Sequence, residues 1–267
     1  MRYKAEEIAG WRKRVPLEEL ERQLVLAPPV KDFIGALEAH RAARGGTPGL
    51  IAEVKQASPS RGVLCPDFRP VRIAGEYEAG GASCLSVLTD AKFFQGGFEY
   101  LAAIAASDVE CPLLCKEFII ERYQVVKARA HGADAILLIA AVLASAEMAA
   151  LVADARALGL QCLIEVHDEA ELARVLRLPS LNGCMLGINN RDLRSFKVSL
   201  EHTERIMASP AGREAARRGL LMAGESGIFT PADVARTRDA GCGAILVGES
   251  LVTQQDRAAA VRALLGL

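Results

Sequence analysis

Eight short apolar runs recur along the chain, and their spacing constrains the fold more than any other feature. They lie at 50–55, 83–88, 112–117, 135–140, 161–166, 184–188, 220–223 and 244–247. Stretches of helical composition separate them, and several of these end at a glycine that suits a left-handed helix cap. Eight alternations of strand and helix predict a closed (β/α)₈ barrel, also called a TIM barrel. An open doubly wound sheet would normally carry a glycine-rich turn after its first strand, and Ser58-Pro59-Ser60 is not one.

The length of the chain suits one domain. A (β/α)₈ barrel typically needs roughly 250 residues, and the chain has 267 with no linker or shift in composition to divide it. We therefore predict a single domain over 1–267, in which 1–49 form an N-terminal helical extension and 50–267 form the barrel. The apolar faces of the extension could cover one end of the core, and the extension offers no obvious chemistry.

The charge balance argues against two classes of partner. The chain carries 32 basic and 33 acidic residues, a net charge of -1, which disfavours nucleic acid or an anionic membrane but leaves room for a local site for a small anion. No apolar run approaches the roughly 20 residues that span a bilayer. The first residues lack the apolar core of a secretory signal. We expect a soluble, cytoplasmic protein.

The cysteines and histidines do not indicate a metal site. The chain has seven cysteines without a Cys-x-x-Cys motif, and several lie inside apolar runs, which is typical of reduced, buried thiols. Its four histidines show no metal-ligand spacing. We predict no metal.

The first apolar run carries two opposite charges. Side chains alternate between the two faces of a strand, so Glu53 and Lys55 point to the same face. If this face lies inside a barrel, the two charges must pair or meet a ligand, because burial is otherwise costly. A structural ion pair on an edge strand is the alternative interpretation.

Polar residues at the ends of other runs favour a catalytic site. Active sites of (β/α)₈ barrels lie at the carboxyl ends of the strands, and five polar residues from four strands are expected at that mouth: Glu53, Lys55, Lys116, Glu165 and Asn189. Any one of them could be an ordinary surface residue at a strand end. Five together, each inside an apolar run, indicate catalysis.

Glycine-bearing turns after the last two strands predict a phosphate site. Loops at this position often present backbone N–H groups to phosphate, and Gly227 and Gly248 allow close approach of the backbone. Ser226 adds a hydroxyl donor, and Lys55 could reach the phosphate charge. Either turn alone is a weak signal, because glycine after a strand is common turn chemistry. We also include Ser58 and Glu249, which follow the first and last strands, in the binding site.

Longer motifs follow the strands in order. They are Ile51-Ala52-Glu53-Val54-Lys55 with Ser58-Pro59-Ser60 and Gly62, Leu85-Ser86-Val87-Leu88-Thr89-Asp90, Cys115-Lys116-Glu117-Phe118-Ile119-Ile120, Leu163-Ile164-Glu165-Val166-His167, Gly187-Ile188-Asn189-Asn190-Arg191-Asp192-Leu193 and Gly224-Glu225-Ser226-Gly227-Ile228. Together with the extension they resemble indole-3-glycerol phosphate synthase, a (β/α)₈ barrel of tryptophan biosynthesis. Two positions depart from the family pattern: Glu117 replaces the usual Asp, and Gly97 replaces the usual Ser. We expect Glu117 to point away from the barrel interior and Gly97 to lie in the loop over the substrate.

The resemblance implies a reaction and three roles. The expected reaction converts 1-(2-carboxyphenylamino)-1-deoxyribulose 5-phosphate into indole-3-glycerol phosphate, CO₂ and water. Lys116 would be the general acid for ring closure, and Glu165 would be the base for dehydration. Glu53 would orient the lysines and the substrate amine. The chemistry is redox-neutral, so we expect no cofactor.

The same resemblance implies further contacts with the substrate. Lys55 would contact phosphate or carboxylate and is a plausible second acid, while Asn189 and Arg191 would hold polar groups. An apolar slot for the anthranilate ring would be formed by Phe93, Phe118, Leu138 and Ile188. Ordinary core packing is the alternative for these four residues. We expect a monomer, and other enzymes of the tryptophan pathway remain open as partners.

Two other functions stay open at this stage. Phosphoribosylanthranilate isomerase is another phosphate-binding barrel enzyme, but it is expected to need a Cys/Asp pair where this chain has lysines and glutamates. A non-catalytic phosphosugar-binding barrel would keep the phosphate turns and tolerate the loss of Lys116 or Glu165, both of which are present.

Overall fold

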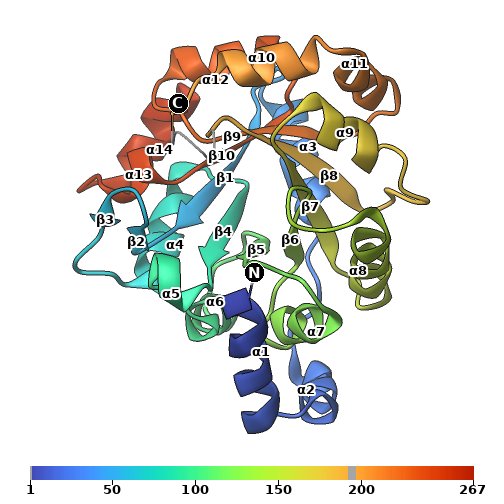
Figure 1. Cartoon of the computed structure of the whole chain (residues 1–267). Helices are drawn as coiled ribbons and strands as arrows, with labels where there is room; N and C mark the ends of the chain where they lie inside the picture. The colour runs from blue at the N-terminus through green and yellow to red at the C-terminus, as the bar shows by residue number, and fades with distance from the viewer. Residues whose placement is uncertain (1, 192–196) are drawn as a thin grey trace.

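Eight parallel strands close into a barrel in this computed structural model, which describes residues 2–191 and 197–267. Each strand pairs with its neighbours in the order β1-β10-β9-β8-β7-β6-β5-β4, and β4 pairs with β1 to close the ring (Figure 1). The strands are β1 (Gly49–Val54), β4 (Cys84–Leu88), β5 (Leu113–Lys116), β6 (Ala135–Ile139), β7 (Gln161–Val166), β8 (Cys184–Asn189), β9 (Met222–Glu225) and β10 (Ala244–Val247). A short hairpin, β2 (Ala57–Ser58) and β3 (Gly62–Val63), follows β1. The predicted (β/α)₈ barrel is confirmed.

Helices surround the barrel and connect its strands (Figure 1). The connecting helices are α4 (Pro70–Gly80), α5 (Ala91–Phe94), α6 (Phe98–Ala105), α7 (Arg122–Ala130), α8 (Ser145–Ala157), α9 (Glu169–Val175), α10 (Glu201–Met207), α11 (Pro210–Arg217), α12 (Pro231–Asp239), α13 (Glu249–Val252) and α14 (Arg257–Leu265). Among the described residues, every helix is too short or too polar to cross a bilayer.

The core has two layers because strand side chains alternate. Residues such as Leu50, Ala52 and Val54 face outward and pack against the helices. Their neighbours, such as Ile51, face inward and fill the lumen together with Leu114 from another strand. The barrel is therefore a packed core up to the layer at which polar side chains begin.

The N-terminal extension covers the barrel in two ways. It consists of α1 (Arg2–Arg14), α2 (Leu17–Gln23), a 3₁₀ turn η1 (Leu24–Leu26) and α3 (Phe33–Ala43). Helix α3 places Phe33 and Leu37 against the inward-facing side chains of the strands, which closes one end of the lumen as the sequence predicted. Helices α1 and α2 lie against α7, where Ile8 and Leu20 pack with Tyr123 (Figure 1).

Candidate active site

A cavity of about 430 Å³ opens at the carboxyl ends of the strands. Its charged lining includes Glu53 from β1, Lys116 from β5, Glu165 from β7 and Glu225 from β9. Apolar side chains line it as well, including Leu137 and Ile139 of β6, Phe93 of α5 and Phe118 from the loop after β5. The cavity thus combines a charged floor with aromatic and aliphatic walls, which is the usual make-up of a site for a small organic ligand.

The period of two in the strands puts the charges there. In β1 the inward residue Ile51 is followed two positions later by Glu53, and in β5 Leu114 is followed by Lys116. The same step leads from Leu163 to Glu165 in β7, from Met185 through Gly187 to Asn189 in β8, and from Ala223 to Glu225 in β9. These five strands therefore each supply an apolar residue to the lumen and a polar residue to the layer above it, whereas β6 supplies the apolar Leu137 and Ile139.

Lys116 lies at the centre of this polar layer. Its Nζ is 2.8 Å from Glu225 Oε2 and 3.4 Å from Glu165 Oε2. Asn189 Nδ2 donates a hydrogen bond to Glu165 Oε1 at 3.1 Å, and His167 Nε2 lies 3.2 Å from the same oxygen. One ammonium therefore bridges two buried carboxylates, and two further groups orient one of them.

The two carboxylates beside Lys116 differ in their proton affinity. Burial alone would raise the pKa of Glu165, but Lys116, His167 and Asn189 outweigh it and hold the pKa below its usual range. Burial raises the pKa of Glu225 above its usual range, against the attraction of Lys116 and with help from the neighbouring charge of Glu165. Environments that shift the pKa values of two neighbouring carboxylates in opposite directions are typical of acid–base sites.

Lys116 and His167 both hold their protons firmly. Burial would lower the pKa of Lys116, yet Glu225, Glu165 and Glu53 together raise it. Burial likewise opposes the charge on His167, whereas Glu165 and Glu171 raise the pKa of His167 to about 10. Lys116 is therefore an ammonium at neutral pH and can donate a proton only when its surroundings change, for example when charge develops on a bound ligand.

A second ion pair lies beside this cluster. Lys55 Nζ donates to Glu53 Oε1 at 2.5 Å, and both side chains are largely buried. Gly248 makes room for them: a methyl group on it would lie 2.5 Å from Glu53 Oε1 and 3.0 Å from Lys55 Nζ. Gly187 plays the same part for Glu225, since its added methyl would lie 2.0 Å from Glu225 Oε1. Two glycines therefore clear the space that the charged side chains occupy.

The turns after β9 and β10 form another part of the cavity wall. Ser226 has φ +66° and Gly227 has φ +78°, so both residues occupy the left-handed region. This conformation is uncommon for serine and turns the backbone sharply at the strand end. Glu249 follows Gly248 and accepts from Arg61 Nε at 2.9 Å, which ties α13 to the β2–β3 hairpin. The predicted phosphate turns thus lie side by side on adjacent strands.

Most of the residues singled out in the sequence meet at this cavity. The lining residues among them are Glu53, Lys55, Ser58, Phe93, Lys116, Phe118, Glu165, Asn189, Arg191, Ser226, Gly227, Gly248 and Glu249. Leu138 and Ile188 lie instead in the outer core against the helices. Their placement in the apolar slot was wrong by one residue of strand register. In β6 the lining residues are Leu137 and Ile139, and in β8 the neighbour of Ile188 that lines the cavity is Asn189. Asp192 and Leu193 of the strand-8 motif lie outside the described residues.

The two departures from the family pattern also have defined places. Glu117 is 2% exposed and pairs with Lys4 of α1, although it also touches the cavity wall. Gly97 has an extended backbone and forms the N-cap of α6, and an added methyl would meet the side chain of Glu99. The expectation that Gly97 lies over the substrate is therefore not supported by its position.

Sequence reasoning missed Glu225, His167 and Lys4. Glu225 and His167 each follow an inward strand residue by two positions, so the period of two could have found them. Lys4 lies on a helix with no distinguishing pattern, and its partners are far away in the chain. Among the described residues, no group of three or more His, Cys, Asp or Glu side chains is arranged to hold a metal ion.

Comparison with known proteins agrees with this geometry. The family model described as indole-3-glycerol phosphate synthase matches residues 1–264. A relative from Arabidopsis thaliana, "Indole-3-glycerol phosphate synthase, chloroplastic", is 50% identical over 99% of this chain and 65% of its own length. An indole-3-glycerol phosphate synthase from Crocosphaera subtropica is 49% identical over 97% of this chain and 85% of its own length.

Solved structures share the fold at low sequence identity. Thiamine phosphate pyrophosphorylase from Pyrococcus furiosus has a TM-score of 0.57 at 15% identity, covering 81% of this chain and 93% of its own. The 3-hexulose-6-phosphate synthase from Salmonella typhimurium has a TM-score of 0.58 at 12% identity, covering 82% of this chain and 97% of its own. These likenesses show the barrel fold alone, whereas the family model and the close relatives identify the chain. It belongs to the indole-3-glycerol phosphate synthase family.

Proposed function

We propose that the cavity at the barrel mouth carries out the reaction of this family, which closes the indole ring of 1-(2-carboxyphenylamino)-1-deoxyribulose 5-phosphate and releases CO₂ and water. The observation that carries the proposal is the position of Lys116. Its ammonium lies between the carboxylates of Glu165 and Glu225 in a cavity with aromatic side chains on one wall and glycine-bearing turns on another. A ring, a carbonyl and a phosphate thus each find a matching part of the site.

The substrate can span the mouth between two separate regions. Phe93 and Phe118 follow β4 and β5, and their ring centroids are 6.3 Å apart in an edge-to-face arrangement. The turns at Ser226–Gly227 and Gly248 follow β9 and β10. In the barrel, β1 lies between these two strands and the pair β4 and β5 on one side, and β6, β7 and β8 lie between them on the other. The anthranilate ring would lie against the two phenylalanines and the phosphate against the turns, with Lys55 near enough to compensate charge.

Lys116 would act as the acid in ring closure. When the aromatic carbon attacks the ketone, the carbonyl oxygen gains negative charge and must receive a proton. Glu225, at 2.8 Å, keeps the ammonium charged and fixed until that moment. The ketone oxygen then competes for the Lys116 proton, and the new carbon–carbon bond is formed as the C=O becomes a hydroxyl group.

Loss of CO₂ and water completes the indole. The carboxylate leaves as CO₂ and its bonding electrons restore the aromatic ring, so the step needs no external electron acceptor. In the dehydration, Glu165 would remove a proton from the ligand. The hydroxyl group would receive a proton from an acid and leave as water, and Lys55 is the nearby candidate for that acid. Asn189 holds Glu165 Oε1 at 3.1 Å and so fixes the direction of the base. Because the overall reaction is redox-neutral, it requires no nicotinamide or flavin. The ketone of the substrate is itself the electron sink, and Lys116 supplies its proton, so the proposed steps call for neither pyridoxal phosphate nor a metal.

Other parts of the site would bind rather than react. Glu53 holds Lys55 at 2.5 Å and can orient the substrate amine. Arg191 and Ser58 line the cavity and are available to polar groups of the ligand. We expect the chain to act as a monomer in the cytoplasm on this phosphorylated substrate, and other enzymes of tryptophan biosynthesis remain open as partners.

Turnover of the substrate tests this function directly. Purified protein is mixed with 1-(2-carboxyphenylamino)-1-deoxyribulose 5-phosphate, and the rise of indole fluorescence is followed together with CO₂ release. We expect one CO₂ for each indole formed. Folded protein that binds the substrate without producing indole would instead be a phosphosugar-binding barrel, and the proposed function would be wrong.

A further inference from the structure

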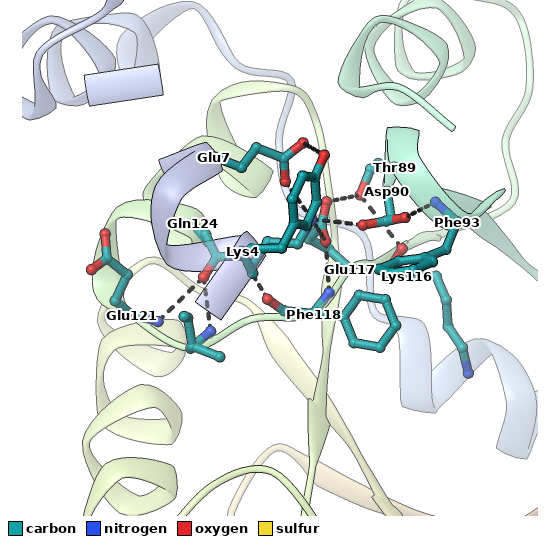
Figure 2. A network of polar contacts seen from close by, with 12 residues as sticks. Lys4, Glu7, Thr89, Asp90, Phe93, Lys116, Glu117, Phe118, Glu121 and Gln124 are labelled. Carbon is teal, nitrogen blue, oxygen red and sulfur yellow. Dashed lines mark hydrogen bonds and ion pairs between the residues drawn. The ribbon is translucent and has the colours of Figure 1, made fainter. Parts of the chain in front are cut away.

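Lys4 is a buried cation that the proposed mechanism does not use. It lies on α1, its residue is 3% exposed, and its Nζ is 2.8 Å from Asp90 Oδ2 and 2.7 Å from Glu117 Oε1. Glu7 on the same helix approaches to 2.5 Å. Figure 2 shows the ammonium reaching from α1 toward these carboxylates. Burial alone would lower the pKa of Lys4, but the carboxylates outweigh it and raise the pKa, so the group stays charged.

Two of these carboxylates hold the aromatic wall of the active-site cavity. Asp90 is the N-cap of α5, and its Oδ1 accepts a hydrogen bond from the backbone N–H of Phe93 at 2.7 Å. Glu117 Oε1 accepts from the backbone N–H of Phe118 at 2.7 Å. Each acid thus binds Lys4 and fixes the backbone of one phenylalanine that lines the cavity (Figure 2).

The same cluster joins the ends of two strands beside Lys116. Glu117 Oε2 accepts from Thr89 Oγ1 at 3.2 Å, and the backbone N–H of Thr89 donates to the carbonyl of Lys116 at 3.2 Å. Without Lys4, two almost fully buried carboxylates that follow the ends of β4 and β5 would lie close together with no cation between them. Like charges in such a setting repel and draw in water, so the loops that carry the phenylalanines would separate.

From these contacts we infer that Lys4 is a positioning residue: the N-terminal helix supplies the cation that sets the Phe93–Phe118 wall for the aromatic part of the ligand. The inference rests on the proposed function in one respect, because it takes this wall as the place of the anthranilate ring. The inference also assigns the N-terminal extension a role in substrate binding, whereas the sequence predicted only that it covers one end of the core.

The matched variants are Lys4→Met and Arg2→Met. Both remove a cation from α1, but the Arg2 side chain is 94% exposed, and within the described part of the chain its ion pair is with Glu6 of the same helix. Two competitive inhibitors report on the two ends of the cavity: anthranilate for the aromatic wall and inorganic phosphate for the turns after β9 and β10. Trp11, the one tryptophan of the sequence, packs against Phe98 with ring centroids 5.5 Å apart. Lys4 Nζ also lies 5.5 Å from the centroid of the Trp11 ring, so docking of α1 is followed by the access of an aqueous quencher to Trp11 and not by its emission alone.

We expect Lys4→Met to raise the inhibition constant of anthranilate and the KM of the substrate about tenfold, with a smaller fall in kcat. The inhibition constant of phosphate should stay within about twofold, and Arg2→Met should resemble the wild type throughout. A purely structural role would lower the unfolding temperature without changing the ratio of the two inhibition constants. An unchanged constant for anthranilate, or equal weakening of both inhibitors, would therefore refute the inference.

A second variant covers loss of α1 docking. If quenching of Trp11 shows that Lys4→Met releases α1, the variant Glu117→Gln tests the inference in its place. Glutamine keeps an acceptor for the Phe118 amide but loses the charge that Lys4 binds. We expect the same selective effect on anthranilate at about threefold, and no such effect would refute the inference. Failure of wild-type protein to turn over the substrate would overturn the proposed function instead. The inference about Lys4 would then be tested by direct binding of anthranilate, with its dissociation constant compared between the wild type and Lys4→Met.

Discussion

The space beside Gly187 allows a sharp test of the charged cluster. A methyl group at this position would lie 2.0 Å from Glu225 Oε1, and contacts below 3.0 Å are essentially never seen. In Gly187→Ala the carboxylate must therefore move by about 1 Å. A shift of this size breaks or lengthens the 2.8 Å contact with Lys116 and releases the proposed acid from its position.

The size of the effect follows from that contact. Hydrogen bonds to charged groups contribute about 1.5–3 kcal/mol, and about 1.4 kcal/mol corresponds to a tenfold change in rate. If the lost interaction positions Lys116 in the transition state, kcat should fall roughly 10- to 150-fold. Stability should fall by a comparable amount, because overpacking of this kind costs about 1–3 kcal/mol.

The assay measures kcat by indole fluorescence at saturating substrate, with thermal unfolding in parallel. Gly75→Ala is the matched control, since an added methyl there meets nothing within 4 Å. It lies within helix α4 and should gain about 0.5–1 kcal/mol of stability with unchanged kcat. A Gly187→Ala enzyme with kcat within about twofold of the wild type would refute the idea that Glu225 holds Lys116 for catalysis.

Three further changes probe the other charges. Lys55→Ala should raise KM by about tenfold or more through lost phosphate contact, and unchanged KM and kcat in steady-state assays would count against this role. Glu225→Gln should move the basic limb of the kcat–pH profile to lower pH, since removing this carboxylate lowers the pKa of Lys116. A basic limb at the same pH would contradict the assignment of Lys116 as the acid. His167→Asn should remove a pH-dependent part of the free energy of unfolding. Because the pKa of His167 is raised to about 10 from its ordinary 6.5, this stabilisation is complete below 6.5 and is lost as pH rises through 10. Denaturant titrations should show the wild type losing on the order of a few kcal/mol more than the variant over that range, and parallel curves would argue against the pairing with Glu165.

The sequence predicted those features that depend on local pattern. The eight apolar runs specify the barrel because each is short, bounded and followed by a helical stretch. Glu53, Lys116 and Glu165 were found because a charge inside an apolar strand is costly unless it faces a ligand or a partner. The general location of the site at the carboxyl ends of the strands then follows from the fold.

Features that depend on register or distant contacts were harder to predict. The run around Leu138 is apolar throughout, so no polar residue marks which side chains face the lumen, and the inward pair is Leu137 and Ile139. Glu225 lies in a motif that reads as a glycine-rich turn, although its strand register points it at Lys116. Lys4 meets its partners only after the extension docks on the barrel, and no local pattern encodes that contact.

A single-turnover experiment shows whether Lys116 donates the proton for ring closure. Excess Lys116→Ala is mixed with substrate, and binding and indole formation are followed separately, with the exposed Lys13→Ala as control. We expect the substrate still to bind, with Kd within about tenfold, while the rate of indole formation falls by roughly 10²- to 10⁴-fold or more. Indole formation at a near-normal rate in this variant would mean that Lys116 is not the acid.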